Sequence, residues 1–110
     1  MKRGFTVLVM LLVVACLSLA GQSARKYLKA GDDFVRNGML EDAIDQFSKA
    51  IEDDPSSADG YVRRARAYEM TGNAGLAYDD YKRANSFLPD DTGILYNLGR
   101  MCNMRSEEHT

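Results

Sequence analysis

The chain has 110 residues, of which 14 are Lys or Arg and 16 are Asp or Glu, so its formal net charge at pH 7 is −2. Residues 21–104 alone carry eleven basic and fourteen acidic side chains, a net charge of about −3. Nucleic-acid binding normally needs a basic face, so this balance argues against a nucleic-acid partner. The single histidine is His109, so His-based metal sites and His-dependent triads are excluded from residues 21–104.

Residues 1–23 have the features of an export signal. Lys2 and Arg3 supply a positive start, and the run from Phe5 to Val14 is apolar except for Thr6. The apolar stretch is shorter than the ~18–20 residues that comfortably span a bilayer. We therefore predict that this segment directs export, and that the rest of the chain lies outside the cytoplasm.

Two processing sites and one unprocessed form are compatible with this signal. Ser18 and Ala20 form a small-x-small pattern for signal peptidase, with cleavage before Gly21. Residues 13–16 resemble a bacterial lipobox in which Cys16 is lipidated, although the apolar Leu17 and Leu19 are unusual for a tether. The third alternative is an uncleaved anchor. The predicted location is the periplasm, or alternatively a membrane to which the protein is attached as a lipoprotein.

After this segment, an offset of thirty-four residues relates two long parts of the chain. It connects Tyr27 with Tyr61, Ala43 with Ala77, Phe47 with Tyr81, Ala50 with Ala84, and Pro55 with Pro89. An offset that carries small, aromatic and proline positions together is typical of a repeat array, whose units bury their apolar faces against each other. It predicts one repeat over 24–57, a second over 58–91, and the first helix of a third over 92–104.

Each repeat contains two apolar stripes with helical spacing. The first stripe is at i, i+3, i+4 and i+7, and its members are Tyr27, Ala30, Gly31 and Phe34, then Tyr61, Arg64, Ala65 and Tyr68, then Leu95, Leu98, Gly99 and Cys102. The second stripe comprises Ala43, Phe47, Ala50 and Ile51, then Ala77, Tyr81, Ala84 and Leu88. These stripes predict the packed faces of paired helices, with Cys102 as a small buried side chain.

Several residues predict where the helices begin and end. Gly38 and Gly72 suit the left-handed conformation at a helix stop, and Pro55 and Pro89 prevent the second helix of each pair from continuing. For the helices that follow, we predict that Ser56 (with Asp59 three residues later) and Asp91 are the N-terminal caps.

This pattern resembles the tetratricopeptide repeat (TPR), whose aromatic, small and proline positions are met in both repeats. Arg64 stands where the family usually has leucine. The resemblance implies an all-α fold, an α-solenoid of about two and a half antiparallel helix-turn-helix repeats. It also implies a right-handed superhelical curve with a concave groove lined by the first helix of each pair, which in the family holds peptides or partner helices.

The predicted groove residues lie opposite or beside the packing stripe of the first helices. They are Leu28, Asp32, Val35, Val62, Arg63, Arg66, Tyr96, Asn97 and Arg100. Arg66 and Arg100 occupy equivalent positions in successive repeats, which predicts binding to a carboxylate or an acidic segment; the alternative is a solvated surface. The family's clamp for chaperone C-terminal carboxylates wants lysine and asparagine where this chain has Leu28 and Asp32, so we do not expect that clamp.

The last six residues, 105–110, resemble the translated start of a common sequencing adapter, and Ser106 replaces the turn glycine expected from the repeat. We predict a non-native tail there; the alternative is a natural charged terminus. Residues 21–104 contain no nucleophile–base pairing, metal cluster or phosphate-binding loop. The sequence therefore predicts a nonenzymatic protein-interaction module of the bacterial cell envelope, without cofactor or metal. Its alternative is the N-terminal fragment of a larger exported enzyme, sensor or peptidoglycan-binding protein.

Overall fold

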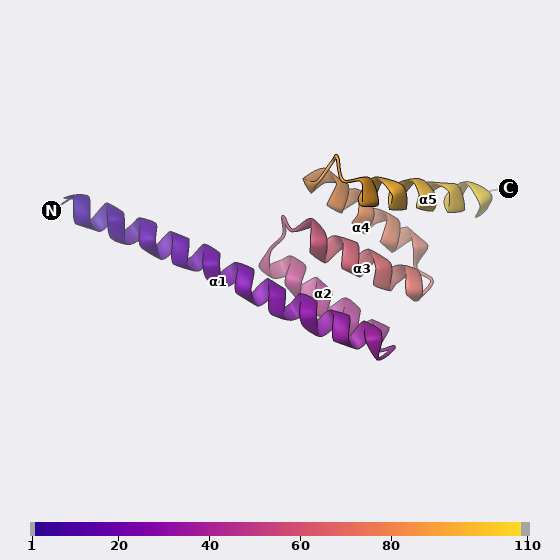
Figure 1. Cartoon of the computed structure of the whole chain (residues 1–110), viewed down its shortest axis with the longest axis horizontal. Coiled ribbons are helices and arrows are strands. Elements are labelled where there is room, and N and C mark those ends of the chain that lie inside the picture. The colour runs from indigo at the N-terminus through magenta and orange to yellow at the C-terminus, as the bar shows by residue number, and fades with distance from the viewer. Residues whose placement is uncertain (1, 109–110) are drawn as a thin grey trace.

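The computed structural model describes the backbone of residues 2–108 and the side chains of residues 4, 6–12 and 22–104. The described backbone forms five helices: α1 (Lys2–Arg36), α2 (Leu40–Asp53), α3 (Ala58–Met70), α4 (Ala74–Phe87) and α5 (Thr92–Glu108) (Figure 1). No strand occurs in this part of the chain. The prediction of an all-α fold is confirmed.

The helices pack as a stack of antiparallel pairs. α1 packs on α2 and α3 packs on α4, while the α2–α3 and α4–α5 contacts join one pair to the next. The molecule is elongated, with extents of 70 × 31 × 18 Å. Figure 1 shows why: the N-terminal part of α1 extends well beyond the stack, and α2 lies only beside its C-terminal part.

The predicted boundary between the export signal and the first repeat falls inside α1, which is continuous over 35 residues. The apolar side chains from Val7 to Leu12 are 42–69% exposed. Among the described residues, no helix is both long enough and apolar enough to cross a membrane. The side chain of Cys16 lies outside the described residues, so lipidation stays a prediction, and so does export. His109 lies wholly outside the described residues.

Glycine ends the first helix of each complete pair, as predicted. Gly38 and Gly72 have φ angles of +73° and +83°, a region that costs other residues conformational energy. The next amide folds back in both turns: Met39 N–H donates to the carbonyl of Phe34, and Asn73 N–H donates to that of Tyr68, each at 2.8 Å. These are Schellman turns, which satisfy carbonyl groups that the helix end leaves unpaired.

One of the two predicted N-terminal caps is confirmed and the other is wrong. The carboxylate of Asp91 accepts a 3.0 Å hydrogen bond from the amide of Ile94, in the first turn of α5. In contrast, α3 is capped by Ser57, whose side chain makes no capping hydrogen bond. The hydroxyl of Ser56 donates instead to the carboxylate of Asp54, two residues earlier in the chain, at 3.2 Å.

Small and aromatic residues of the predicted stripes form the core. Phe47 and Tyr81 are 1% and 0% exposed, and Ala43, Ala65 and Ala77 are completely buried. Phe47 lies directly on Gly31: a Cβ atom placed on Gly31 would be 2.3 Å from the ring. The close α1–α2 contact therefore requires a glycine at position 31, because any side chain there would collide with the ring of Phe47.

The stripe predicted for the third repeat is only partly buried: Leu98 packs against the core, but other members are exposed. Leu95 is 46% exposed and Cys102 is also exposed, so the prediction of a buried thiol is wrong. α5 contacts α4 through a different side, on which Ile94 and Met101 are 4% and 2% exposed. No helix within the described residues covers the Leu95 side, whereas α2 and α4 cover the equivalent sides of α1 and α3.

Two further details differ from the sequence prediction. Leu88 was assigned to the second stripe, but it follows the last residue of α4 and is 49% exposed. α5 was expected to end at residue 104, but its backbone continues to Glu108. Ser106 stands where the repeat pattern expects a glycine that would end the helix. Serine does not favour the left-handed conformation of a helix stop, which is consistent with the continuation of α5 past this residue.

Candidate protein-binding groove

Three hollows lie along the face made by α1, α3 and α5. We call them the α1 hollow, the middle hollow and the α5 hollow, with volumes of about 270, 370 and 250 Å³. Asp59 lines all three, Arg63 lines the first two, and Arg66 lines the last two. Because neighbouring hollows share these side chains, they form one groove across both repeats and the start of α5.

Most of the predicted groove residues line these hollows. They are Leu28, Asp32, Val35, Val62, Arg63, Arg66 and Asn97. Tyr96 and Arg100 line none of the three; Tyr96 is 71% exposed on α5.

Further residues outside the predicted set line the hollows, among them Asp59, Met70, Leu88 and Ile94. Asp59 lies on the same helical face as Val62 and Arg66, so helical spacing was a sufficient signal for it. Leu88 lies in the α4–α5 connection and Ile94 in the first turn of α5. Helical periodicity cannot show where this connection places them.

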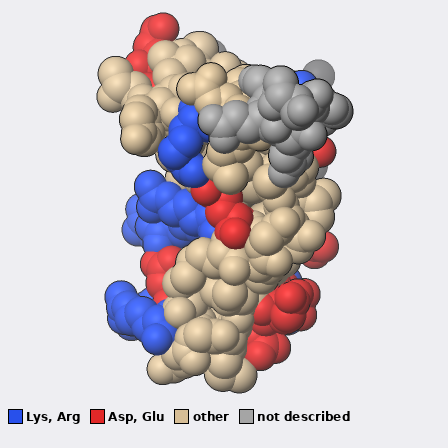
Figure 2. All heavy atoms as spheres, turned by 90° about the vertical axis from the view of Figure 1, so that its right-hand side faces the viewer, with Lys and Arg blue, Asp and Glu red and all other residues tan. Residues whose placement is uncertain are grey.

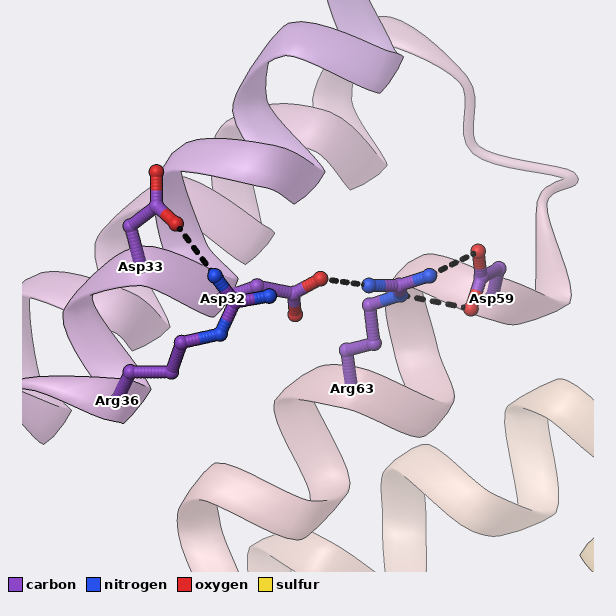
Figure 3. A network of polar contacts seen from close by, with 5 residues as sticks. All are labelled: Asp32, Asp33, Arg36, Asp59 and Arg63. Atoms are coloured by element: carbon purple, nitrogen blue, oxygen red, sulfur yellow. Dashed lines mark hydrogen bonds and ion pairs between the residues drawn. The ribbon is translucent and has the colours of Figure 1, made fainter.

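At the α1 end, Arg63 joins two helices through two carboxylates (Figure 3). Its Nε and Nη2 donate to the two oxygens of Asp59 at 2.8 and 3.1 Å, and its Nη1 donates to Asp32 on α1. The hydrogen bond to Asp59, followed by that to Asp32, raises the pKa of the Arg63 guanidinium although burial acts in the opposite direction. Arg63 is thus held by two carboxylates of the protein itself and links α3 to α1.

A second link joins α5 to α3. Nη2 of Arg100 donates to both oxygens of Glu69, at 2.9 and 2.7 Å. The hydroxyl of the buried Tyr81 donates to the same carboxylate at 2.5 Å. The hydrogen bond from Arg100 to Glu69 raises the pKa of Arg100, while burial and then the bond to Glu69 raise the pKa of Tyr81.

Arg66 and Arg100, which the sequence paired as equivalent, are therefore in different states. Arg100 has a carboxylate partner within the protein. Arg66 is exposed, and no hydrogen bond or ion pair connects it to any residue that the structure describes. The hollows around it contain charges of both signs, among them Asp59 and Arg63. Figure 2 shows that Lys or Arg groups alternate with Asp or Glu groups down the left-hand side of the molecule in that view.

The neighbouring Arg64 points away from the groove into the helix packing. Its Nε and Nη2 donate to the two oxygens of Asp80 on α4 at 2.7 and 2.8 Å, and its Nη1 donates to Ser48 on α2 at 3.1 Å. The guanidinium lies 5.9 Å from the ring centre of Tyr61 and 5.8 Å from that of Tyr68. Arg64 is therefore a structural residue in the place of the usual leucine.

The described side chains offer no metal site: among them, no group of three or more His, Cys, Asp or Glu residues could hold an ion. The groove instead has charged residues in all three hollows and most of its apolar residues in the middle and α5 hollows. It can bind a polypeptide by shape, apolar contact and charge.

Comparisons with known proteins agree with this architecture. Residues 31–72 match the family described as TPR repeat. DnaJ homolog subfamily C member 3 of Rattus norvegicus is 30% identical over 76 residues, which cover 69% of this chain and 15% of that protein. The chain thus spans less than a fifth of the length of this relative.

Two solved structures have the same arrangement of helices. MamA has a TM-score of 0.70 at 26% identity, with 76% of this chain and 49% of that one covered. The second TPR domain of Spaghetti (RPAP3), solved with the HSP90 peptide SRMEEVD, has a TM-score of 0.74 at 22% identity, with 79% and 81% covered. Residues 31–72 are thus TPR sequence, and the chain has the α-solenoid fold of TPR proteins.

Proposed function

We propose that this chain is a noncatalytic protein-binding module, and that the groove on α1, α3 and α5 holds a peptide or helix of a partner protein. The observation that carries the proposal is the continuity of the three hollows through Asp59, Arg63 and Arg66. A groove of this kind offers apolar contact in the middle and α5 hollows, and its fixed charges select the partner. The RPAP3 neighbour, which was solved with a bound peptide, supports the same use of the fold.

The partner segment that we propose carries acidic residues, because Arg66 has no internal carboxylate partner. It is not the ligand of the family's clamp for C-terminal carboxylates, since Leu28 and Asp32 stand where that clamp wants lysine and asparagine. Asp32 is moreover ion-paired with Arg63, and a second carboxylate approaching that pair would meet a negative charge.

Site-specific photo-crosslinking tests this proposal. A photoreactive amino acid placed at Met70, which is 58% exposed in the middle hollow, should crosslink to a partner in the cells that make the protein. The same group at Lys49, an exposed residue of α2 outside the three hollows, is the matched control. Equal crosslinking at the two positions, or crosslinking only at Lys49, would contradict a groove-specific function.

We further propose that the protein is exported and acts in the bacterial periplasm, or on an envelope membrane as a lipoprotein modified at Cys16. The support is the basic start and apolar run of residues 1–23. Mass spectrometry of the mature N-terminus decides between the two forms: a chain starting at Gly21 indicates soluble export, and a lipid on Cys16 indicates an anchor. An intact Met1 in a cytosolic fraction would exclude both.

A second candidate function is that of a targeting module within a larger exported enzyme, sensor or peptidoglycan-binding protein. It is favoured by the small share, 15%, of DnaJ homolog subfamily C member 3 that the chain covers. Sequencing the gene from the source genome past the codon for Met104 tests this candidate. A catalytic or peptidoglycan-binding domain in the same reading frame would support it, and a stop codon soon after the repeats would refute it.

A further inference from the structure

Arg66 occupies a special place in the groove, because it lines both the middle hollow and the α5 hollow. The middle hollow has Val35, Phe47 and Met70 on one side of this arginine. The α5 hollow has Val62, Leu88 and Ile94 on the other. The guanidinium therefore lies between two hollows that each have an apolar floor.

Arg66 also differs from its neighbours in having no ion-pair partner among the described residues. Of the arginines of α3 and α5 whose side chains are described, Arg63, Arg64 and Arg100 each have a carboxylate partner, and Arg66 has none. An exposed guanidinium of this kind favours a carboxylate, which it can bind through two parallel hydrogen bonds.

The acidic residues of the same two hollows are already engaged. They are Asp32, Asp59 and Asp91. Both oxygens of Asp59 and one oxygen of Asp32 accept hydrogen bonds from Arg63. Asp91, which lines the α5 hollow, accepts a hydrogen bond from the amide of Ile94 at the start of α5. None of these three carboxylates makes a hydrogen bond to Arg66, and each already has a partner of its own.

The apolar floors are open to solvent where a partner would reach them. Met70 is 58% exposed and Leu88 is 49% exposed, one in each hollow. Apolar side chains of a bound segment would remove this surface from water, which favours binding.

We propose, resting on the proposed role of the groove in partner binding, that the partner segment has a defined pattern: one acidic residue flanked on both sides by apolar residues. The carboxylate binds Arg66, and the two apolar side chains fill the middle hollow and the α5 hollow. Arg100 takes no direct part in this recognition, because its charge is already paired with Glu69.

Selection from a random peptide library displayed on phage, with the full chain as bait, tests the pattern. The selected peptides should share one Asp or Glu between two apolar positions. Fluorescence anisotropy with the consensus peptide should then show a loss of affinity of about 10- to 100-fold for Arg66→Glu, the size expected for one charge-assisted interaction. Lys49→Glu makes the same change of charge on α2, away from the groove, and should leave the affinity unchanged.

A charge exchange sharpens the result. A peptide in which the acidic residue is replaced by lysine should bind Arg66→Glu better than it binds the wild-type chain. Selected peptides without a shared acidic position, or an affinity that is indifferent to Arg66→Glu, would overturn the inference.

A double substitution separates this inference from the proposed function. Met70→Ala with Leu88→Ala removes an exposed apolar side chain from each hollow, and circular dichroism verifies that the fold is kept. If this variant loses affinity while Arg66→Glu does not, the groove binds peptides but the acidic pattern is wrong. If neither variant changes the affinity, or if selection enriches no peptide, the groove is not the binding surface and the proposed function fails as well.

Discussion

Replacing Asp80 with asparagine should destabilise the helix stack strongly, although Asp80 is remote from the groove. The side chain of Asp80 is 8% exposed and that of Arg64 is 21% exposed. Removing one partner of a buried pair typically costs about 3–5 kcal/mol, because the other charge is left in the interior without compensation. Arg64 retains some contact with water and its hydrogen bond to Ser48, so we expect a loss of about 3 kcal/mol, the lower end of that range.

A double-substitution cycle shows whether the loss arises from the stranded charge. Arg64→Leu alone leaves the carboxylate of Asp80 unpaired and should also be destabilising, whereas Arg64→Leu with Asp80→Leu removes both charges. An apolar pair of similar size is often as stable as the ion pair, so the double variant should lie within about 1 kcal/mol of the wild type, or above it.

Urea unfolding followed by far-ultraviolet circular dichroism measures these free energies. Asp79→Asn is the matched control, because Asp79 is the exposed neighbour of Asp80 on α4, and it should change stability by less than about 0.5 kcal/mol. The reasoning is refuted if Asp80→Asn costs no more than Asp79→Asn, or if the double variant is as unstable as the two single variants combined.

Three further predictions follow from particular contacts. Gly31→Ala should cost about 1–3 kcal/mol, because the new Cβ would lie 2.3 Å from the ring of the buried Phe47; the equivalent Gly99→Ala meets no atom within 4 Å and should stabilise the helix by about 0.5–1 kcal/mol in the same urea assay. Burial and the bond to Glu69 raise the pKa of Tyr81, so the folded state keeps a proton that the unfolded state loses above about pH 10. The stabilisation is complete below that pH and is lost as the pH rises further; urea midpoints should fall more steeply above pH 10 for the wild type than for Tyr81→Phe, and parallel curves would contradict this. In hydrogen exchange, the amides of α5 should exchange faster than those of α3, since one side of α5 is uncovered; equal protection of the two helices would be the opposing result.

The repeat structure itself was predictable from the sequence, because its signals are local and periodic. The glycines at 38 and 72 and the prolines at 55 and 89 define the turns through backbone conformation alone. The aromatic and small residues of the first two repeats identify the buried faces, since a helix returns to the same face every three or four residues. The same spacing placed most of the groove residues on one side of the stack.

The helical spacing gave a wrong prediction of burial in α5, where no second helix packs against the predicted stripe. Leu95 and Cys102 repeat the pattern of Tyr61 and Tyr68, yet both are exposed. Periodicity shows which side chains share a face, but burial also requires another element to pack against that face. Which side of α5 meets the stack is therefore a property of the assembled helices.

Three arginines on α3 show the same division most clearly. The sequence alone determined that Arg64 points away from Arg63 and Arg66, because successive residues of an α-helix are rotated by about 100° whereas residues three apart share a face. Only the tertiary structure decided what each one meets: Asp32 and Asp59 for Arg63, Asp80 for Arg64, and open groove for Arg66. Two of these partners are 31 and 16 residues away along the chain. The state of a charged side chain depends on such distant groups, so it is settled only when the helices pack.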